Sequence, residues 1–281
     1  MHSTKDNLQV LHEDNHLIIV NKRPGDIVQG DKTGDLPLSE IVKQYIAEKY
    51  NKPGNVFCGV VHRLDRPTSG ALVFARTSKA LERLNAQFRD KETNKIYWAI
   101  VETAPEKQSG RLVHHLKKNE AQNKSYPVNA SVSGSKEAIL SYRKLASGDR
   151  YHLLEITLET GRHHQIRVQL SSIGCIIKGD VKYGAKRSNP DGSICLHARY
   201  LKFTHPTSKE EVSVVRPKSA LENTSKRTTN NQNYMYCNAS SAGNSTDATS
   251  AAVYGIGVGG TPSKPRLHLT ETLEQCRALP F

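Results

Sequence analysis

The sequence predicts an α+β fold built on a mixed, largely antiparallel β-sheet with flanking helices. Two observations carry this prediction: strand-like runs predominate along the chain, and helical patterns only punctuate them. The chain is also long enough for such a fold, because 281 residues with 36% hydrophobic side chains suffice for one large packed domain or two small ones.

The first half of the chain supplies both kinds of element. LQVLHED and HLIIVNK are two strand-like runs, and Asp14-Asn15 makes a turn between them. LPLSEIVKQYIAEKY repeats its apolar side chains at helical spacing, which predicts a helix. GALVFA, residues 70–75, predicts a strand, and TSKALERLNAQF predicts an amphipathic helix with Thr77 or Ser78 as its N-cap.

The second half is richer in strands. Further strands or hairpins are predicted for KIYWAIVE, SVSGSKEAILSYRKL, YHLLEITLE and RYLKFTHP. One helix is predicted from His163 onward, because Ile166, Leu170 and Ile173 share one face of a helix.

The composition changes near residue 218. Residues 1–218 read as a packed domain, whereas residues 219–281 are rich in Asn, Ser, Thr, Gly and Ala. Such a segment buries too little apolar surface to offset its ordering entropy, so we expect a low-complexity, disordered or aberrant tail there. Most of the net charge of +13 then belongs to the domain, which favours a phosphate-bearing partner.

Several classes of protein are disfavoured. No run approaches the roughly 18 apolar residues of a membrane span, and the N-terminus MHSTKDNLQV lacks the apolar core of a secretory signal. The five cysteines form no CxxC pair, which disfavours a disulfide framework or a zinc ribbon. We therefore expect a cytoplasmic protein without membrane contact.

The stretch VVHRLDRPTSG, residues 60–70, is the first candidate for chemistry. Two valines suit a buried strand end, and the Pro-Thr-Ser-Gly run predicts a turn. Asp65 would then lie at the mouth of the sheet between Arg63 and Arg66, which would keep the carboxylate ionised. A structural salt bridge in a loop explains these residues equally well.

The second candidate is LETGRHHQIRVQLSSIG, residues 158–174. Arg162, Gln165 and Arg167 offer hydrogen-bond donors for a phosphate or for a carboxylate elsewhere in the chain. A metal site is the competing interpretation, but the adjacent His163 and His164 would point about 100° apart on a helix and make a poor chelate. We expect no metal.

Five ordered blocks together resemble the RluA family of pseudouridine synthases, over about residues 8–215. The blocks are HRLDRPTSG, KIYWAIV, GRHHQIRVQL, GDVKYG and LHARYLKFTHP. The resemblance implies an isomerase that converts specific uridines of structured rRNA or tRNA to pseudouridine. It also implies the family's mixed-sheet catalytic domain with a central basic cleft. The reaction oxidises and hydrolyses nothing, so neither a cofactor nor a metal is expected.

The resemblance also implies roles for individual residues. Asp65 would be the essential catalytic residue, Tyr97 would lie against the base, and Arg167 would pair with the carboxylate. Arg63 would help to displace the target base from its stack, and Leu170 would line the pocket. RNA or base contacts are further expected from His62, Arg162 and Gln165.

Departures from the family pattern leave a second hypothesis open. His163 and Gln169 replace the usual threonine and histidine, and the resemblance fails near Arg216. A catalytically weak RNA-binding or ribosome-assembly factor with the same fold is therefore the alternative, and a metal-dependent hydrolase is a distant third. Many relatives carry an N-terminal S4 domain, for which we expect no room here.

RNA recognition is therefore expected from the basic surface of a monomer. The candidate residues on it are Arg111, His114, His115, Lys117 and Lys118.

Overall fold

The structure is a computed structural model that describes residues 2–31 and 33–215. The predicted low-complexity segment, residues 219–281, lies outside the described residues. The helices are α1 (Leu38–Lys49), α2 (Ser78–Arg89) and α3 (Gln165–Ser172), with 3-10 turns η1 (Lys5–Asn7) and η2 (Val181–Tyr183).

The strands are β1 (Val10–Glu13), β2 (Leu17–Lys22), β3 (Gly59–Val60), β4 (Ser69–Ala75), β5 (Asn94–Val101), β6 (Ser109–Asn119), β7 (Lys124–Val128), β8 (Lys136–Ser147), β9 (His152–Leu158), β10 (Leu196–Thr204) and β11 (Glu211–Val215).

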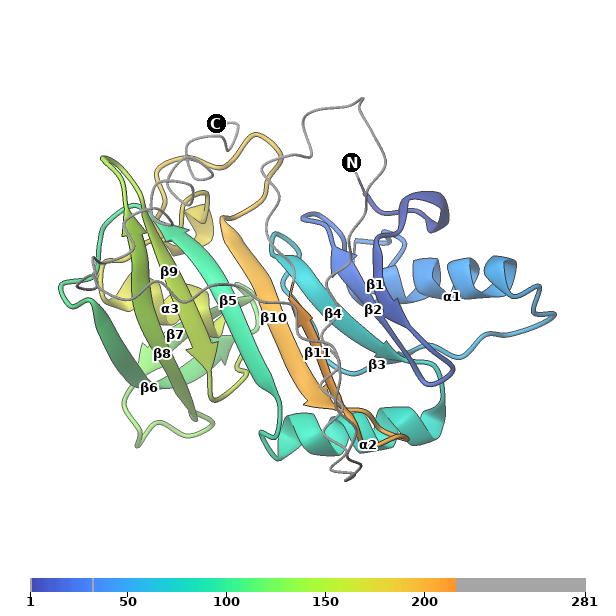
Figure 1. The fold of residues 1–281 in the computed structure, drawn as a ribbon. Coiled ribbons are helices and arrows are strands. Elements are labelled where there is room, and N and C mark those ends of the chain that lie inside the picture. The colour runs from blue at the N-terminus through green and yellow to red at the C-terminus, as the bar shows by residue number, and fades with distance from the viewer. Residues whose placement is uncertain (1, 32, 216–281) are drawn as a thin grey trace, which may run out of the picture.

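One mixed sheet contains all of these strands, in the order β1-β2-β4-β10-β5-β9-β8-β6-β7, with β3 paired to β4 and β11 to β10 (Figure 1). Within the described part of the chain, β4 and β10 form the only parallel pair. The predicted α+β fold on a largely antiparallel mixed sheet is confirmed.

Two apolar layers cover the N-terminal half of the sheet. Alternate side chains of a strand point to opposite faces, so Ile18 and Val20 pack with the buried face of α1, while Leu17 and Ile19 pack with α2. All six residues of β2 are consequently buried. Helix α2 begins as predicted, because the Thr77 hydroxyl accepts a hydrogen bond of 3.1 Å from the Ala80 N–H.

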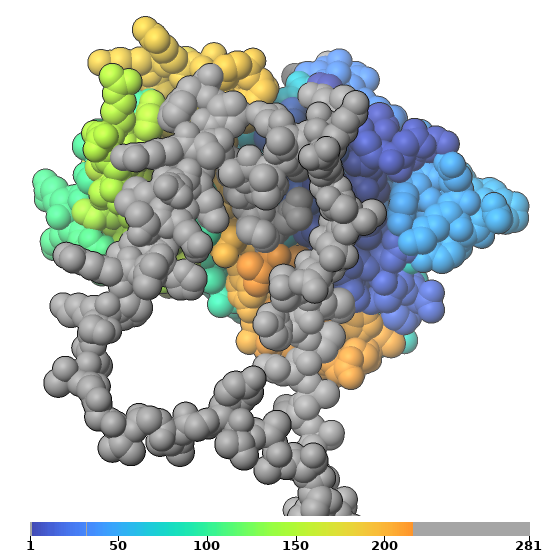
Figure 2. Space-filling model, turned by 45° about the horizontal axis from the view of Figure 1, so that its top comes forward, coloured from blue at the N-terminus to red at the C-terminus, as the bar shows by residue number. Residues whose placement is uncertain are grey.

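The other half of the sheet carries α3 and the long hairpins. Helix α3 packs against β6 and β7, and Figure 1 shows it away from α1 and α2, with β10 between the two halves. The surface has the same division: in Figure 2 green and yellow residues occupy one side, blue residues the other, and orange residues the middle. The two segments that resemble a catalytic site, residues 60–70 and 158–174, thus come from opposite halves and can meet only across β10.

The helix predicted from His163 begins two residues later. His164 takes a left-handed conformation with φ of 55°, and the regular helix starts at Gln165. The apolar repeat predicts which face of the helix is buried, but it does not encode the left-handed residue that precedes the helix.

Candidate active site

Asp65 lies in a tight turn between β3 and β4. The Thr68 N–H donates to the Asp65 carbonyl over 3.0 Å and closes the turn. The chain then enters β4 through Gly70, whose φ is +120° and where a Cβ would lie 2.3 Å from the Ala198 carbonyl oxygen. Only glycine permits this close approach of β4 to β10, so the Ser-Gly of the motif fixes where the turn presents Asp65.

Lys22, at the end of β2, stabilises this turn through hydrogen bonds to its main chain. Its side chain is fully buried, and its ammonium donates to the carbonyls of Arg23 (3.0 Å), Arg66 (3.0 Å) and Thr68 (2.8 Å). Burial lowers the pKa of Lys22 to about 8, against the opposing charges of Asp26 and Asp65. The three carbonyls accept hydrogen bonds from all three N–H groups of the ammonium, so the main chain on both sides of Pro67 is fixed.

Arg66 anchors the same turn to the preceding loop. Its Nε donates to the Gly25 carbonyl over 3.1 Å, and its Nη2 pairs with Asp35. The expectation that Arg63 and Arg66 flank the Asp65 carboxylate and keep it ionised is therefore wrong in geometry. Arg66 is held by Gly25 and Asp35, and the guanidinium that reaches Asp65 belongs to a residue 102 positions later.

That guanidinium is Arg167, on α3. Its Nη1 donates to Asp65 Oδ2 over 3.0 Å, while Nε and Nη2 both bond to the Asp180 carboxylate over 2.7 Å. Arg167 is 5% exposed and Asp180 is 1% exposed, whereas the Asp65 side chain is 27% exposed. Burial alone would lower the pKa of Arg167, but the Asp180 hydrogen bonds and the Asp65 charge raise it above its usual value. Asp65 thus faces a permanent cation and keeps one side open.

A second group, from the residue that precedes α3, approaches the same carboxylate. His164 Nε2 lies 3.7 Å from Asp65 Oδ2, and His164 Nδ1 is hydrogen-bonded to the Tyr183 hydroxyl at 2.9 Å. Burial, with the Arg167 charge, lowers the pKa of His164 to about 2, so the imidazole is neutral at ordinary pH. The His163 ring stacks on it at 3.8 Å between centroids, and His163 Nδ1 bonds the Ser125 hydroxyl at 2.9 Å.

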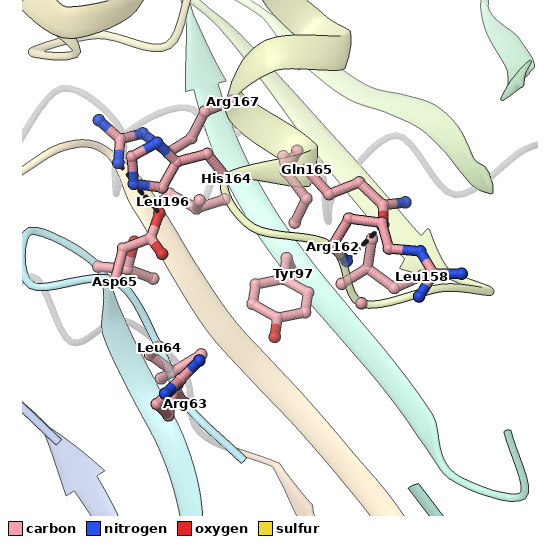
Figure 3. Close-up of a pocket in the computed structure, with 13 residues that line it drawn as sticks. Arg63, Leu64, Asp65, Tyr97, Leu158, Arg162, His164, Gln165, Arg167 and Leu196 are labelled. Atoms are coloured by element: carbon pink, nitrogen blue, oxygen red, sulfur yellow. Dashed lines mark hydrogen bonds and ion pairs between the residues drawn. The ribbon is translucent and has the colours of Figure 1, made fainter. Parts of the chain in front are cut away.

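Asp65, His164 and Arg167 line a cavity of about 110 Å³. Its other lining residues are Arg63, Leu64, Thr68, Tyr97, Leu158, Gly161, Arg162, Gln165, Ile166 and Leu196. In Figure 3, Asp65, His164 and Arg167 gather at one side, and Tyr97 lies between them and Arg162. The cavity therefore has the Asp65–Arg167 ion pair at one side, Arg162 at the other and the Tyr97 ring between them, which suits a flat polar ring.

Tyr97 and Arg63 bring unused polar groups to this cavity. Tyr97 is 8% exposed, and its hydroxyl has no hydrogen-bond partner among the described residues. Burial, with the Asp65 charge, raises the pKa of Tyr97 above its usual value, so the phenol is neutral. Arg63 is exposed and makes no ion pair with any described residue. Both groups remain available to a ligand.

Arg162 and Gln165 line the cavity but have structural partners. The Gln165 Oε1 accepts from the Arg162 N–H (2.9 Å) and the Thr160 hydroxyl (2.8 Å), and its Nε2 donates to the Ile139 carbonyl. Arg162 Nε donates to the Glu137 carbonyl over 2.8 Å. Gln165 therefore fixes the loop before α3, and only the remaining nitrogens of Arg162 are uncommitted.

His62 and Leu170 do not line the cavity. His62 stacks on Phe88 of α2 at 4.7 Å, and its Nε2 accepts from the Val73 N–H over 3.2 Å. Burial lowers its pKa to about 3, so it is a neutral packing residue. Leu170 is fully buried in the core below α3. The structure thus gives no support to base contacts by His62 or pocket lining by Leu170.

The basic surface expected on β6 is partly neutralised. Arg111 pairs with Glu159 over 2.8 Å and 2.9 Å, Lys118 pairs with Glu120, and His114 is hydrogen-bonded to Gln169. Lys117 and His115 make no ion pair with a described residue.

Three residues that shape the site were not singled out from the sequence. Lys22 ends a buried apolar strand, which is an unusual place for a charge and could have marked it. Asp180 lies between glycines in KGDVKYG, where it suggested only a tight connection. His164 was considered only as a metal ligand.

Residues 2–31 and 33–215 lack two kinds of feature. No group of three or more His, Cys, Asp or Glu side chains in them could hold a metal ion. None of the helices they form is long and apolar enough to cross a membrane.

Comparison with known proteins gives consistent matches. A sequence profile described as RNA pseudouridylate synthase matches residues 16–172, more than half of the chain. An uncharacterized RNA pseudouridine synthase of Synechocystis is 33% identical over 217 residues, which are 76% of this chain and 66% of that protein. Ribosomal large subunit pseudouridine synthase D of Zymomonas mobilis is 35% identical over 73% of this chain and 67% of its own length. The chain thus spans about two thirds of the length of these relatives.

Solved structures agree. Human RNA Pseudouridylate Synthase Domain Containing 1 has 25% identity and a TM-score of 0.59, covering 77% of this chain and 86% of that one. Human RNA Pseudouridylate Synthase Domain Containing 4 shares the fold, with a TM-score of 0.62 and 24% identity over 74% and 88% of the two chains.

Proposed function

The chain belongs to the RNA pseudouridylate synthase family, a family of isomerases, and we propose that it converts uridines of structured rRNA or tRNA to pseudouridine at the Asp65 cavity. The observation that carries the proposal is the Asp65–Arg167 ion pair of 3.0 Å at the edge of a cavity also lined by Tyr97. The names of relatives that act on the large ribosomal subunit favour rRNA as the first substrate to test.

The reaction balances without an external reagent. The N1–C1′ glycosidic bond breaks, the uracil turns within the site, and C5 bonds to C1′. C5 then releases its proton, while N1 gains one. The chemistry requires a fixed negative charge near C1′, where positive charge develops, and groups that hold the detached base.

Asp65 fits the first requirement. Arg167 holds one carboxylate oxygen, and the open side of the carboxylate faces the cavity. Asp180 in turn fixes Arg167 through two short hydrogen bonds, so the carboxylate is oriented before substrate arrives.

Tyr97 and Arg63 fit the second requirement. The Tyr97 ring offers a face for the uracil and a neutral hydroxyl that can donate a hydrogen bond. The target base must leave its stack to reach Asp65, and the exposed guanidinium of Arg63 suits the space that the base vacates. Arg162 contributes positive charge to the same rim.

Tritium release tests the proposal. Wild-type protein incubated with rRNA and tRNA transcripts carrying [5-³H]uridine should release tritium to water. Asp65→Asn should bind the RNA and release none, whereas Asp149→Asn, which changes an exposed carboxylate outside the cavity, should match wild type.

Two outcomes would contradict it. RNA binding without release by the wild type would favour the alternative, an RNA-binding factor with the same fold. Full activity of Asp65→Asn would show that another residue supplies the negative charge.

Three further expectations belong to the same proposal. We expect a monomer, which light scattering would check. We propose that the enzyme acts in the cytoplasm, where rRNA and tRNA substrates occur. We also propose that residues 1–218 form the catalytic domain, so a chain truncated after residue 218 should release tritium at the wild-type rate.

A further inference from the structure

Thr68 carries a buried hydroxyl that no described residue uses. The residue is 2% exposed, it lines the cavity, and its Oγ1 has no hydrogen-bond partner. Among the described cavity-lining residues, no other has a buried polar side-chain atom in this condition. A buried hydroxyl without a partner costs folding free energy, so its presence at this place needs an explanation.

The main chain of Thr68 cannot move to satisfy the hydroxyl. Its N–H donates to the Asp65 carbonyl over 3.0 Å, and its carbonyl accepts from the Lys22 ammonium over 2.8 Å. The remaining freedom of the residue is rotation about χ1, which moves Oγ1 while the backbone stays fixed. Asp65 and Thr68 are the two ends of one hydrogen-bonded turn, so the backbone of Thr68 keeps a fixed position relative to that of Asp65, and χ1 alone sets where Oγ1 points.

We propose that Thr68 is a substrate-binding residue whose hydroxyl bonds the uridine nucleotide when that nucleotide enters the cavity beside Asp65. A hydroxyl both donates and accepts, which suits the carbonyls of uracil and the hydroxyls of ribose. The unmet hydrogen bond of the free enzyme is then met in the complex, where it aligns the nucleotide with the carboxylate. This inference rests on the proposed function of the cavity.

Thr93 is a matched control. It is also buried, at 8% exposed, and its Oγ1 also lacks a partner, but it does not line the cavity. Valine has nearly the shape of threonine, so either Thr→Val change removes an unsatisfied polar atom and leaves no large void. Neither change should lower the thermal stability of the protein. The two variants differ only in whether the lost hydroxyl could meet a substrate.

The experiment is single-turnover tritium release from [5-³H]uridine transcripts, with Tm measured on the same samples. We expect Thr68→Val to slow release about tenfold, Thr68→Ser to stay within about threefold of wild type, and Thr93→Val to match wild type. The Tm of Thr68→Val should equal or exceed that of wild type.

Each other outcome overturns the inference in a distinguishable way. Release by Thr68→Val at the wild-type rate refutes a substrate contact and leaves the proposed function intact. A lower Tm for Thr68→Val assigns the hydroxyl to folding. Absence of release by the wild type overturns the proposed function, and the Thr68 inference falls with it.

Discussion

The turn that carries Asp65 and the helix that carries Arg167 meet at one ion pair, but they are held in place by different kinds of interaction. On the Asp65 side most of the stabilising bonds end on main-chain atoms: Lys22 donates to three carbonyls, and Arg66 Nε donates to a fourth. These bonds fix the path of the backbone and leave the Asp65 side chain open to the cavity.

On the Arg167 side the bonds join side chains. Arg167 is fixed by the buried Asp180 carboxylate, and His164 is fixed by Tyr183. The two sides therefore have different tasks. The turn positions Asp65 but leaves its carboxylate free on the cavity side, whereas the contacts around α3 hold the Arg167 guanidinium in one geometry. Substitutions that remove each kind of bond should therefore have different effects on stability and rate.

Arg167→Met should have the largest effect. The variant leaves the Asp180 carboxylate, 1% exposed, without its counter-ion, which should cost about 3–5 kcal/mol of unfolding free energy and abolish tritium release. Urea unfolding would measure the loss. Arg143→Met breaks the exposed Arg143–Glu155 pair and should cost at most about 1 kcal/mol. An equal loss in the two variants would contradict a buried charge network.

Lys22→Met should have the next largest effect. The carbonyls of Arg23, Arg66 and Thr68 lose their shared donor, which should cost about 2–3 kcal/mol. The turn would also loosen, so tritium release should slow about tenfold because the carboxylate is no longer placed. Wild-type kinetics in a stable Lys22→Met protein would show that the main-chain contacts do not position Asp65.

The same lysine predicts a pH dependence of stability. Its pKa is about 8 in the folded protein and about 10.5 when unfolded, so the unfolded state binds more protons between these values. Wild-type unfolding free energy should therefore rise by about 2 kcal/mol between pH 7 and pH 10, relative to Lys22→Met. Urea titrations at several pH values would measure the difference, and parallel curves for the two proteins would contradict the lowered pKa.

Tyr183→Phe removes a single hydroxyl on the Arg167 side and should therefore have a smaller effect. The Tyr183 hydroxyl accepts from the Ser125 N–H over 3.0 Å and bonds His164 Nδ1, so both groups lose a partner. The expected cost is about 1 kcal/mol of unfolding free energy, with a few-fold slower release as His164 loses its orientation. Tyr200→Phe is the control, because the Tyr200 hydroxyl bonds no described residue and its removal should change neither quantity.

Arg66→Ala should have only a small effect on stability. Its ion pair with Asp35 is exposed, so the loss should stay below about 1 kcal/mol. Arg63→Ala should not change stability but should slow release, since its guanidinium is uncommitted and lines the cavity. Comparing the two variants by unfolding and by tritium release separates the two arginines on either side of Leu64-Asp65. Equal rates would contradict the role proposed for Arg63.

Much of the fold could be predicted from the sequence because its signals are local. The apolar repeats of β2, β4, α1 and α2 each bury one side or both against a neighbour, and the Thr77 N-cap acts within its own helix. The start of α3 was missed by two residues, because the apolar repeat does not encode the left-handed conformation of His164, whose ring is hydrogen-bonded to Tyr183, 19 residues away.

For the site, the sequence by itself determined which residue types are present and which motif they form. HRLDRPTSG contains the carboxylate and the glycine that permits the close approach, and the family resemblance pointed to Asp65, Tyr97 and Arg167. The resemblance implied that Arg167 pairs with Asp65, but only the tertiary structure showed how that pair forms and that Arg66 does not join it, because adjacency in the chain does not set the direction of a side chain. Arg66 turns to Gly25 and Asp35, while Arg167 arrives from 102 residues away through its contact with buried Asp180. The physical reason is burial: a guanidinium in the interior goes where carboxylates can compensate its charge, and the fold, not the spacing, brings them together.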